Sequence, residues 1–202
     1  MIKVSREELI KLINDEKYEE LRNCNVSEIE DFYALFWRSS ISSEDKKYIA
    51  NWDVSKVNNF RNMLYGCKNI KFLKPLENWN VSNGIDFRYM FYECYSLNSL
   101  EGLENWDVSK GKRFDYMFHN CINLKSLEGL ENWDVSNGKQ QDSALVSNVL
   151  NFRGMFSKCS NLKSLKPLKN WNVSNGKDFS YMFEGCYNLE SLEGLEKWNV
   201  SK

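Results

Sequence analysis

Proline is nearly absent from this chain, and no segment of it is apolar for long. Only two of the 202 residues are proline, while 14% are aromatic, a composition that argues against extended disorder. No run approaches the length of about 18 apolar residues, so we expect no membrane-spanning helix. The opening residues, MIKVSREELIKLINDE, also lack the apolar core of a signal peptide. The sequence as it stands therefore predicts a cytoplasmic protein. A cell-surface or secreted location is the alternative if the chain is a fragment.

An excess of charge of either sign is also missing. The chain has 27 basic and 28 acidic residues, which gives a formal net charge of −1. Such a balance provides no general attraction to nucleic acid or to an anionic membrane. With 42% hydrophobic residues, the chain is long enough to bury a sizeable core.

A unit of 27 residues repeats along most of the chain. Tryptophan marks it at positions 52, 79, 106, 133, 171 and 198, with spacings of 27, 27, 27, 38 and 27. Apart from one insertion, each full copy reads W-[DN]-V-S-x-x-x-x-F-x-x-M-[FL]-x-x-C-x-x-[LI]-x-x-L-x-x-L-x-x-W. A degenerate copy precedes the first tryptophan, with Cys24 in the tryptophan slot. Self-similarity at a fixed period is typical of stacked repeat proteins.

The residues before the repeat predict a helix. Ser5 and Glu8 have the spacing of a capping box, and Leu9, Leu12 and Ile13 form an apolar stripe behind it. We expect residues 1–23 to be an N-terminal helical cap that covers the open end of the first coil. Residues 24–202 are then one repeat domain together with the cap.

The apolar pattern within one copy indicates the fold class. Phe87, Met90, Phe91 and Cys94 are spaced as one face of a short helix, and after the cysteine the apolar period becomes three. A slot filled only by glycine or proline, such as Gly102, suggests a bend whose N–H needs no partner. The [DN]-V-S segment fits an Asx turn, because Asp and Asn interchange there and both are acceptors. The predicted fold is an α/β repeat solenoid of about seven leucine-rich-repeat-like coils, with short helical turns and short strands.

These residues resemble the BspA-like leucine-rich-repeat surface proteins, in the branch whose units read W-[DN]-V-S-x-V-x-x-M-x-x-M-F. The resemblance extends over roughly residues 24–202. Two columns differ, because Phe87 and its equivalents stand where the family often has Met, and Gly84 and its equivalents replace the usual Val. The resemblance implies a leucine-rich-repeat-like solenoid without catalysis that binds proteins, often in adhesion or host contact. Many members of that family are exported.

Few residues suggest catalysis or metal binding. Five of the six cysteines occur once per full copy in the same inward slot, and Cys24 takes the tryptophan slot of the degenerate copy. No C-x-x-C pair exists, so a buried thiol ladder is expected rather than zinc or disulfides. The only histidine, His119, occupies a slot that other copies fill with Tyr65 or Ser157, which argues against a catalytic role. No phosphate-binding loop or nucleophile elbow is found. The sequence therefore predicts a protein that is not an enzyme and has no cofactor or metal.

Tyrosine and arginine gather in the outward slots of the predicted helical turns. On a helical wheel, Arg88, Tyr89 and Tyr92 lie opposite the apolar stripe, and stacking would align them with their equivalents in other copies. Both residue types are enriched at binding hot spots, although an ordinary solvated face is the alternative. The opposite wall, SLEGLE in three copies, suits either a basic partner or simple solubility. The candidate partner-binding residues are Arg61, Tyr65, Arg88, Tyr89, Tyr92, Tyr116, Arg153 and Tyr181.

One copy carries 11 extra residues near positions 140–150. The segment ALVSNVLNF matches WDVSKVNNF of an earlier copy, so Val146 and Val149 can enter the coil. Alternatively, Trp133 keeps its place and residues 140–150 bulge outward. Insertions in repeat proteins often lie on a functional face, and a tolerated repeat remnant is the other interpretation. The candidate contact residues of this loop are Gln140, Gln141, Asp142 and Leu145.

The sequence therefore predicts a noncatalytic protein-recognition scaffold that binds a protein partner through a solenoid face, as an intracellular inhibitor or adaptor. The alternative is an adhesion module of a bacterial cell-surface protein that binds host or matrix proteins. The identity of the partner and the oligomeric state stay open.

Overall fold

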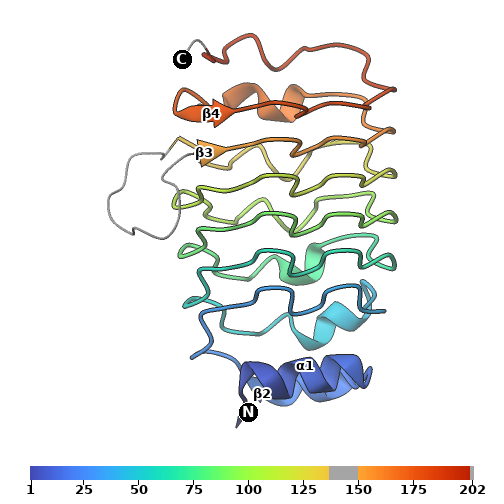
Figure 1. Cartoon of the computed structure of the whole chain (residues 1–202), viewed down its shortest axis with the longest axis vertical. Coiled ribbons are helices and arrows are strands. Elements are labelled where there is room, and N and C mark those ends of the chain that lie inside the picture. The colour runs from blue at the N-terminus through green and yellow to red at the C-terminus, as the bar shows by residue number, and fades with distance from the viewer. Residues whose placement is uncertain (137–149, 201–202) are drawn as a thin grey trace.

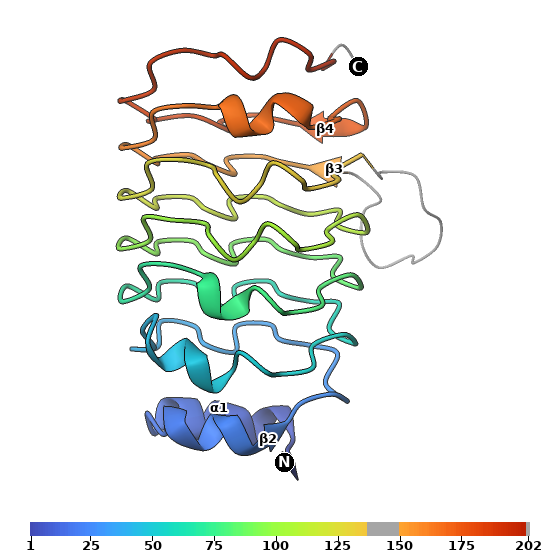
Figure 2. The same ribbon diagram turned by 180° about the vertical axis from the view of Figure 1, so that it is seen from behind.

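Successive copies of the repeat lie one above another in the computed structural model, which describes residues 1–136 and 150–200. The N-terminus lies at one end of this stack and the last described residues lie at the other (Figure 1; reverse side in Figure 2). We call one copy of the repeat a layer. Each layer runs across one broad face, turns at an edge and returns across the other face.

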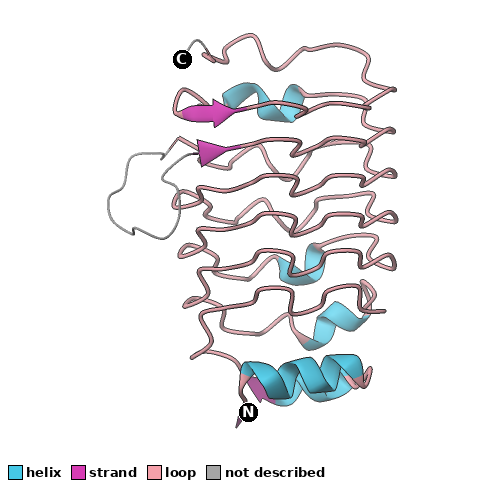
Figure 3. Cartoon of the chain, in the orientation of Figure 1, coloured by secondary structure: helices cyan, strands magenta, loops and turns pink. Residues whose placement is uncertain are grey.

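Regular secondary structure is sparse. Helix α1 (Arg6–Asn14) is the one α-helix of the described residues, and two short parallel strand pairs, β1 with β2 and β3 with β4, are the described sheets (Figure 3). No helix in residues 1–136 or 150–200 is long and apolar enough to cross a membrane. The remaining elements are β1 (Ile2–Lys3), η1 (Tyr18–Asn23), β2 (Cys24–Asn25), η2 (Asp45–Tyr48), η3 (Lys74–Leu76), β3 (Leu150–Asn151), η4 (Lys166–Asn170) and β4 (Gly176–Asp178), where η denotes a 3₁₀ helix.

The predicted α/β repeat solenoid with leucine-rich-repeat-like coils was wrong. Among the described residues no repeat contains an α-helix, and the strands are only two or three residues long. Turns and irregular chain make up most of each layer instead. The reason is that many backbone N–H groups donate to carbonyls of a neighbouring layer, and the apolar pattern of the sequence does not reveal these acceptors.

The segment expected to be helical is a run of consecutive turns. Met90 N–H donates to the Phe87 carbonyl three residues back, at 3.3 Å, whereas Tyr89 N–H donates to Asp115 in the next layer, at 3.0 Å. In an α-helix each N–H donates to the carbonyl four residues back. Because N–H groups of this segment donate to carbonyls of a neighbouring layer instead, the segment is not an α-helix. Tyr89 and Glu93 also have left-handed φ angles of 56° and 57°. The spacing therefore identified the buried side chains correctly but not their conformation.

Hydrogen bonds between layers recur at equivalent positions along the stack. The first residue of each turn segment donates its N–H to the layer that follows, as Phe60 does to Asp86 at 2.8 Å and Phe87 to Arg113 at 2.9 Å. Single parallel bridges accompany them. These bridges join Asp31 with Asn59, Asn59 with Asp86, Asp86 with Arg113, and Arg113 with Asn151.

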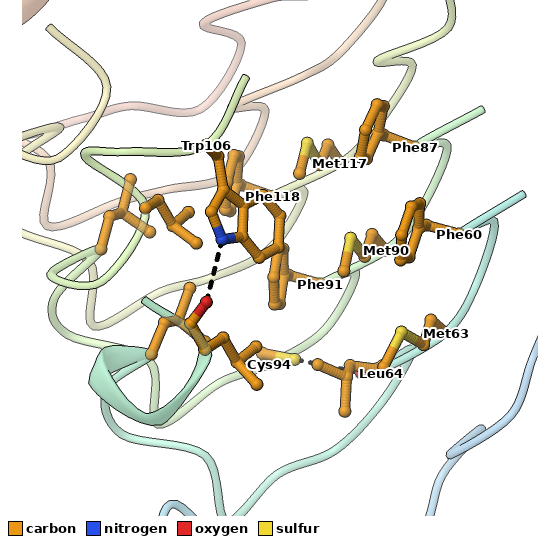
Figure 4. Close-up of a cluster of buried hydrophobic side chains, with 14 of the residues drawn as sticks. Phe60, Met63, Leu64, Phe87, Met90, Phe91, Cys94, Trp106, Met117 and Phe118 are labelled. Atoms are coloured by element: carbon orange, nitrogen blue, oxygen red, sulfur yellow. Dashed lines mark hydrogen bonds between the residues drawn. The ribbon is translucent and has the colours of Figure 1, made fainter. Parts of the chain in front are cut away.

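The core is tied across layers by one indole and one thiol per repeat (Figure 4). Trp106 Nε1 donates to the carbonyl of Leu76 at 3.0 Å, and Cys94 Sγ donates to the carbonyl of Leu64 at 3.2 Å. Because a buried donor without an acceptor costs free energy, each layer depends on its neighbour. Burial raises the pKa of the Cys94 thiol well above its usual range, so it stays a protonated donor. The predicted ladder of inward, unbridged cysteines is confirmed, with Cys186 of the last layer only partly buried.

The glycine–proline slot differs from expectation. Gly102 N–H does have a partner, because it donates to Glu104 Oε2 at 2.7 Å. Gly102 adopts φ +104°, and a Cβ there would lie 2.6 Å from the Leu73 carbonyl oxygen of the neighbouring layer. Pro75 instead lies within η3, where it needs no N–H. Close approach of two backbones, rather than an unneeded donor, restricts this slot.

The Asx turns predicted after the tryptophans are confirmed for Trp52, Trp79, Trp106, Trp133 and Trp171. Ser109 N–H donates to Asp107 Oδ1 at 3.0 Å, and Ser82 N–H donates to Asn80 Oδ1 at 3.2 Å. Since an amide and a carboxylate accept equally here, the slot needs an acceptor and not a charge.

The capping box of the N-terminal helix is also confirmed. Glu8 N–H donates to Ser5 Oγ at 3.2 Å, and Ser5 N–H donates to Glu8 Oε2 at 2.7 Å. Helix α1 buries Leu9 and Ile13 and lies across the first end of the stack (Figure 1).

The insertion leaves the tryptophan column intact. Trp133 stacks 6.5 Å from Trp106 and 6.3 Å from Trp171, measured between ring centroids. Val135 before the insertion and Leu150 after it are both buried. Of the two arrangements considered, Trp133 keeps its place in the layer. Val146 and Val149 lie outside the described residues.

A buried lysine interrupts the leucine column. Lys46 occupies the slot that Leu73 fills in the next layer, is 0% exposed, and its Nζ has no hydrogen-bond partner in the described part of the chain. Burial lowers its pKa from 10.5 to about 8, with weaker opposing effects from Cys94 and Cys67. Below pH 8 the folded protein must therefore hold a charge in the core.

We expect Lys46→Met to stabilise the protein at pH 7 by about 2–3 kcal/mol, because it removes this charge. Between pH 8 and 10.5 the unfolded chain holds more protons on Lys46 than the folded chain does, so wild-type stability rises with pH there. The advantage of the variant should shrink over the same interval. Urea unfolding from pH 7 to 10 measures both, with Lys47→Met as the exposed control. A loss of stability at pH 7 would contradict the interpretation.

Two glycine substitutions separate backbone clash from backbone strain. Gly102→Ala should cost about 3 kcal/mol or more, because its Cβ meets a neighbouring carbonyl. Gly185→Ala should cost only about 1 kcal/mol, because the nearest atom is 3.4 Å away and Glu93 adopts a similar φ in its layer. Thermal and urea unfolding give both values. Equal costs would show that φ alone matters.

Candidate partner-binding face

Two columns of aromatic rings run along the broad face made by the turn segments. In the first column, ring centroids lie 4.6 Å apart for Tyr65 and Tyr92, and 4.5 Å apart for Tyr92 and His119. Trp37 extends this column toward α1, 6.4 Å from Tyr65. Because neighbouring strands of chain lie about 4.8 Å apart, like side chains in successive layers stack face to face. The aromatic face, as named from here on, consists of Trp37, Tyr65, Tyr89, Tyr92, Tyr116 and His119, with Tyr181 in the Tyr116 slot near the other end of the stack.

The second column interlocks with the first. Tyr89 and Tyr116 stack at 5.5 Å with an angle of 4° between their planes. Each also meets the first column edge-on, Tyr89 against Tyr92 at 5.7 Å and Tyr116 against His119 at 5.5 Å. Such pairs contribute about 0.5–1.5 kcal/mol each beyond burial. The rings are therefore held in place before any partner arrives.

Exposure is greatest toward the ends of the face. Trp37 is 54% exposed and Tyr181 is 53% exposed, whereas His119 is 7% exposed. Burial lowers the pKa of His119, and its Nδ1 has no hydrogen-bond partner among the described residues. His119 thus serves the stack as a neutral ring. The exposed rings at either end are the parts that a partner can reach.

Charges beside the aromatic face alternate between layers. Arg88 forms a bidentate ion pair with Asp86 of its own layer, and in the next layer Arg113 pairs with Asp115, 2.9 Å between Nη2 and Oδ1. The order is reversed, so Asp86 lies in register with Arg113. Asp86 mainly, and Asp115 to a smaller extent, raise the pKa of the Arg88 guanidinium. These arginines are partly buried and already neutralised, so they are not free anion sites.

The structure brings the eight candidate residues onto this side of the stack. Arg61 lies over the ring of Tyr33, 5.7 Å from guanidinium carbon to centroid, and Arg153 lies 5.0 Å from the centroid of Tyr181. Arg153 Nε also donates to the Tyr116 hydroxyl at 3.0 Å. The expected clustering of Arg and Tyr side chains is therefore observed. Gln140, Gln141, Asp142 and Leu145 lie outside the described residues.

Sequence reasoning missed the N-terminal part of this face. Trp37 aligns with Tyr65 one layer earlier, in the degenerate copy, and that alignment was the available signal. Arg38 lies 5.1 Å from the Trp37 ring centroid and 5.7 Å from that of Tyr65. His119 was weighed only as a catalytic residue, although its slot already pointed to the aromatic column.

A groove of about 810 Å³ opens beside Trp37. It lies between the end of α1 and the first layers. Cationic, acidic and aromatic side chains line it, and the aromatic ones besides Trp37 are Tyr18 and Tyr95. Ser40 Oγ donates to Glu16 Oε1 at 2.6 Å across it. Arg38, Lys68, Asn69, Glu93 and Tyr95 also line this groove.

The cysteine thiols are the nucleophile candidates of the inward slots, and burial keeps them protonated. Burial raises the pKa of the Cys67 and Cys186 thiols to about 11 and raises that of the Cys121 thiol well above its usual range, so none is a ready nucleophile. No cluster of three His, Cys, Asp or Glu side chains able to hold a metal ion occurs in residues 1–136 and 150–200. The exposed chemistry of this face is aromatic contact and hydrogen bonding.

Reversing one ion pair tests the alternation of charge. Asp86→Arg combined with Arg88→Asp keeps a pair within the layer but brings like charges into register with the next layer. We expect a cost of roughly 1–3 kcal/mol that falls as salt is added. Making the same exchange in the next layer too, with Arg113→Asp and Asp115→Arg, should recover most of it. Urea unfolding at about 20 mM and about 500 mM salt measures the free energy of unfolding of each variant at low and high ionic strength. A salt-independent cost would point to packing instead.

Comparison with known proteins gives one positive result. A family model described as "Mycoplasma protein of unknown function, DUF285" matches residues 7–133 and again residues 98–202. No curated protein matches, and no solved structure matches. Because each match covers more than half of the chain, this protein belongs to the DUF285 family of Mycoplasma proteins of unknown function.

Proposed function

We propose that this protein is a noncatalytic recognition module that binds another protein through its aromatic face. The interlocked columns of Trp37, Tyr65, Tyr89, Tyr92 and Tyr116 are the observation that carries the proposal. Aromatic side chains, tyrosine and tryptophan above all, dominate hot spots in protein interfaces.

The rigidity of the face supports recognition. A ring fixed by two neighbours loses little conformational freedom when a partner covers it, so more of the contact energy appears as affinity. The nearby arginines keep their charges inside ion pairs and over tyrosine rings, which limits non-specific attraction of anions. The aromatic face is therefore suited to a partner surface that is complementary to it in shape rather than in charge.

The cellular setting separates two versions of this function. In the first, the module acts inside the cell as an inhibitor or adaptor on one enzyme or complex. In the second, it is an adhesion module that binds host or matrix proteins, which the resemblance to BspA-like surface proteins favours. Both versions use the same face and differ in the source of the partner.

Trp37→Ala together with Tyr181→Ala should remove partner capture, because both side chains are more than half exposed and contribute contact area rather than core. The control is Leu192→Ala, a side chain 66% exposed in the Leu-x-x-Leu segment that forms the opposite wall. Captured proteins from cognate cell extract and from host matrix are compared by mass spectrometry, with circular dichroism to confirm folding. A specific partner retained by the double variant would move the interface away from this face.

A further inference from the structure

One edge of the stack carries cations that the rest of the surface does not neutralise. The edge is formed by the four residues after each cysteine, where the layers turn from one face to the other (right-hand edge in Figure 1). Its exposed cations are Lys68, Lys71, Lys125 and Lys163. Within the described residues, none of these four lysines forms an ion pair, that is, has its Nζ within 4.0 Å of a carboxylate oxygen.

Some lysines on the glutamate-rich wall are neutralised by ion pairs with glutamates. On the glutamate-rich wall, Lys74 lies 2.8 Å from Glu77 and 3.5 Å from Glu101, and Lys166 lies 3.0 Å from Glu193. The edge differs because the slots around Lys68, Lys71 and Lys125 hold Asn, Ser, Tyr and Ile, and a glutamate enters only at Glu190, next to Lys163 in the last layer.

Polar amides and hydrophobic groups lie between these lysines. A hollow of about 260 Å³ is lined by Lys71, Lys125, Ser96, Asn98 and Asn123. The side chains of Ser96 and Asn98 make no hydrogen bond within the described ranges, so they are available as both donors and acceptors. Beside them the preceding column presents Tyr95, half-buried, and Ile122, 37% exposed.

The edge is continuous with the aromatic face. The larger groove is lined by Trp37 and Arg38 from that face and by Lys68, Asn69 and Tyr95 from the edge. A bound chain can therefore pass from one surface to the other. Glu16 and Glu93 are the carboxylates that line this groove, and Glu16 Oε1 already accepts a hydrogen bond from Ser40 Oγ.

We infer that the edge binds an extended acidic segment of the partner protein, which runs along the lysine column and enters the groove beside Trp37. Carboxylates of the segment pair with Lys68, Lys71 and Lys125, and its backbone bonds to the side chains of Ser96 and Asn98. Amide side chains offer both donors and acceptors, which match a peptide backbone, whereas sulfates or phosphates offer acceptors alone. Ile122 and Tyr95 accept an apolar side chain between the acidic ones. The inference rests on the proposed protein-recognition function and names the partner's chemistry.

The probe is a fluorescein-labelled peptide of about twelve residues that alternates Glu with Ala, compared with its Gln–Ala counterpart. Fluorescence anisotropy should show binding of the Glu peptide that weakens as salt rises, as surface charge pairing requires. Lys68→Glu, Lys71→Glu and Lys125→Glu combined should weaken it at least tenfold. The matched control is Lys110→Glu, Lys169→Glu and Lys177→Glu, with the same change of net charge, and it should weaken binding less than twofold.

Each outcome decides one point. Equal loss in both triple variants would overturn the site, because long-range charge would then explain the binding. Tighter binding of a heparin fragment or of single-stranded DNA than of the Glu peptide would overturn the peptide assignment. If the Glu peptide fails to bind while Trp37→Ala with Tyr181→Ala still abolishes partner capture, the acidic segment is wrong and the recognition function stands. If capture survives in that double variant, the aromatic face is wrong whatever the peptide does.

Discussion

The structure depends on hydrogen bonds that leave one layer and end in the next. A repeat of 27 residues cannot satisfy its own buried donors, because its turns direct N–H groups such as that of Tyr89 away from the layer. The indole of Trp106 and the thiol of Cys94 likewise find their acceptors in a neighbouring layer. Since an unpaired buried donor costs about as much as a lost hydrogen bond, a layer is stable only in contact with other layers.

This dependence explains which positions vary and which do not. Tryptophan, cysteine and the glycine of the bend are constrained by atoms of the adjacent layer, so every full copy keeps the first two. The outward slots have no buried donor to satisfy, so different residue types fill them in different copies. Where neighbouring layers place rings in the same outward slot, the same spacing that builds the core also builds the aromatic face. The aromatic face is thus a consequence of the stacking.

Charge shows a similar division. In the ladder beside the aromatic face, Asp86 and Arg113 lie in register and their pairs alternate. On the glutamate-rich wall, Lys74 is paired across layers. Along the remaining edge, Lys71 and Lys125 lie two layers apart with Asn98 between them. A chain with a net charge of −1 thereby carries a local cationic edge, which no total of charges would reveal.

The sequence by itself determined the repeat, its inward residues, the capping box and the Asx turns, because each depends on spacing within one copy. It also placed tyrosine and arginine on one outward side. It did not determine the backbone conformation. The positions of Phe87, Met90 and Cys94 fit a helix and a run of turns equally well, and only the neighbouring layer decides where the N–H groups go. The tertiary structure likewise decided that Trp133 stays in its column, that Lys46 is buried, and that Trp37 and the lysine edge share one groove, because each of these depends on contacts between residues far apart in the chain.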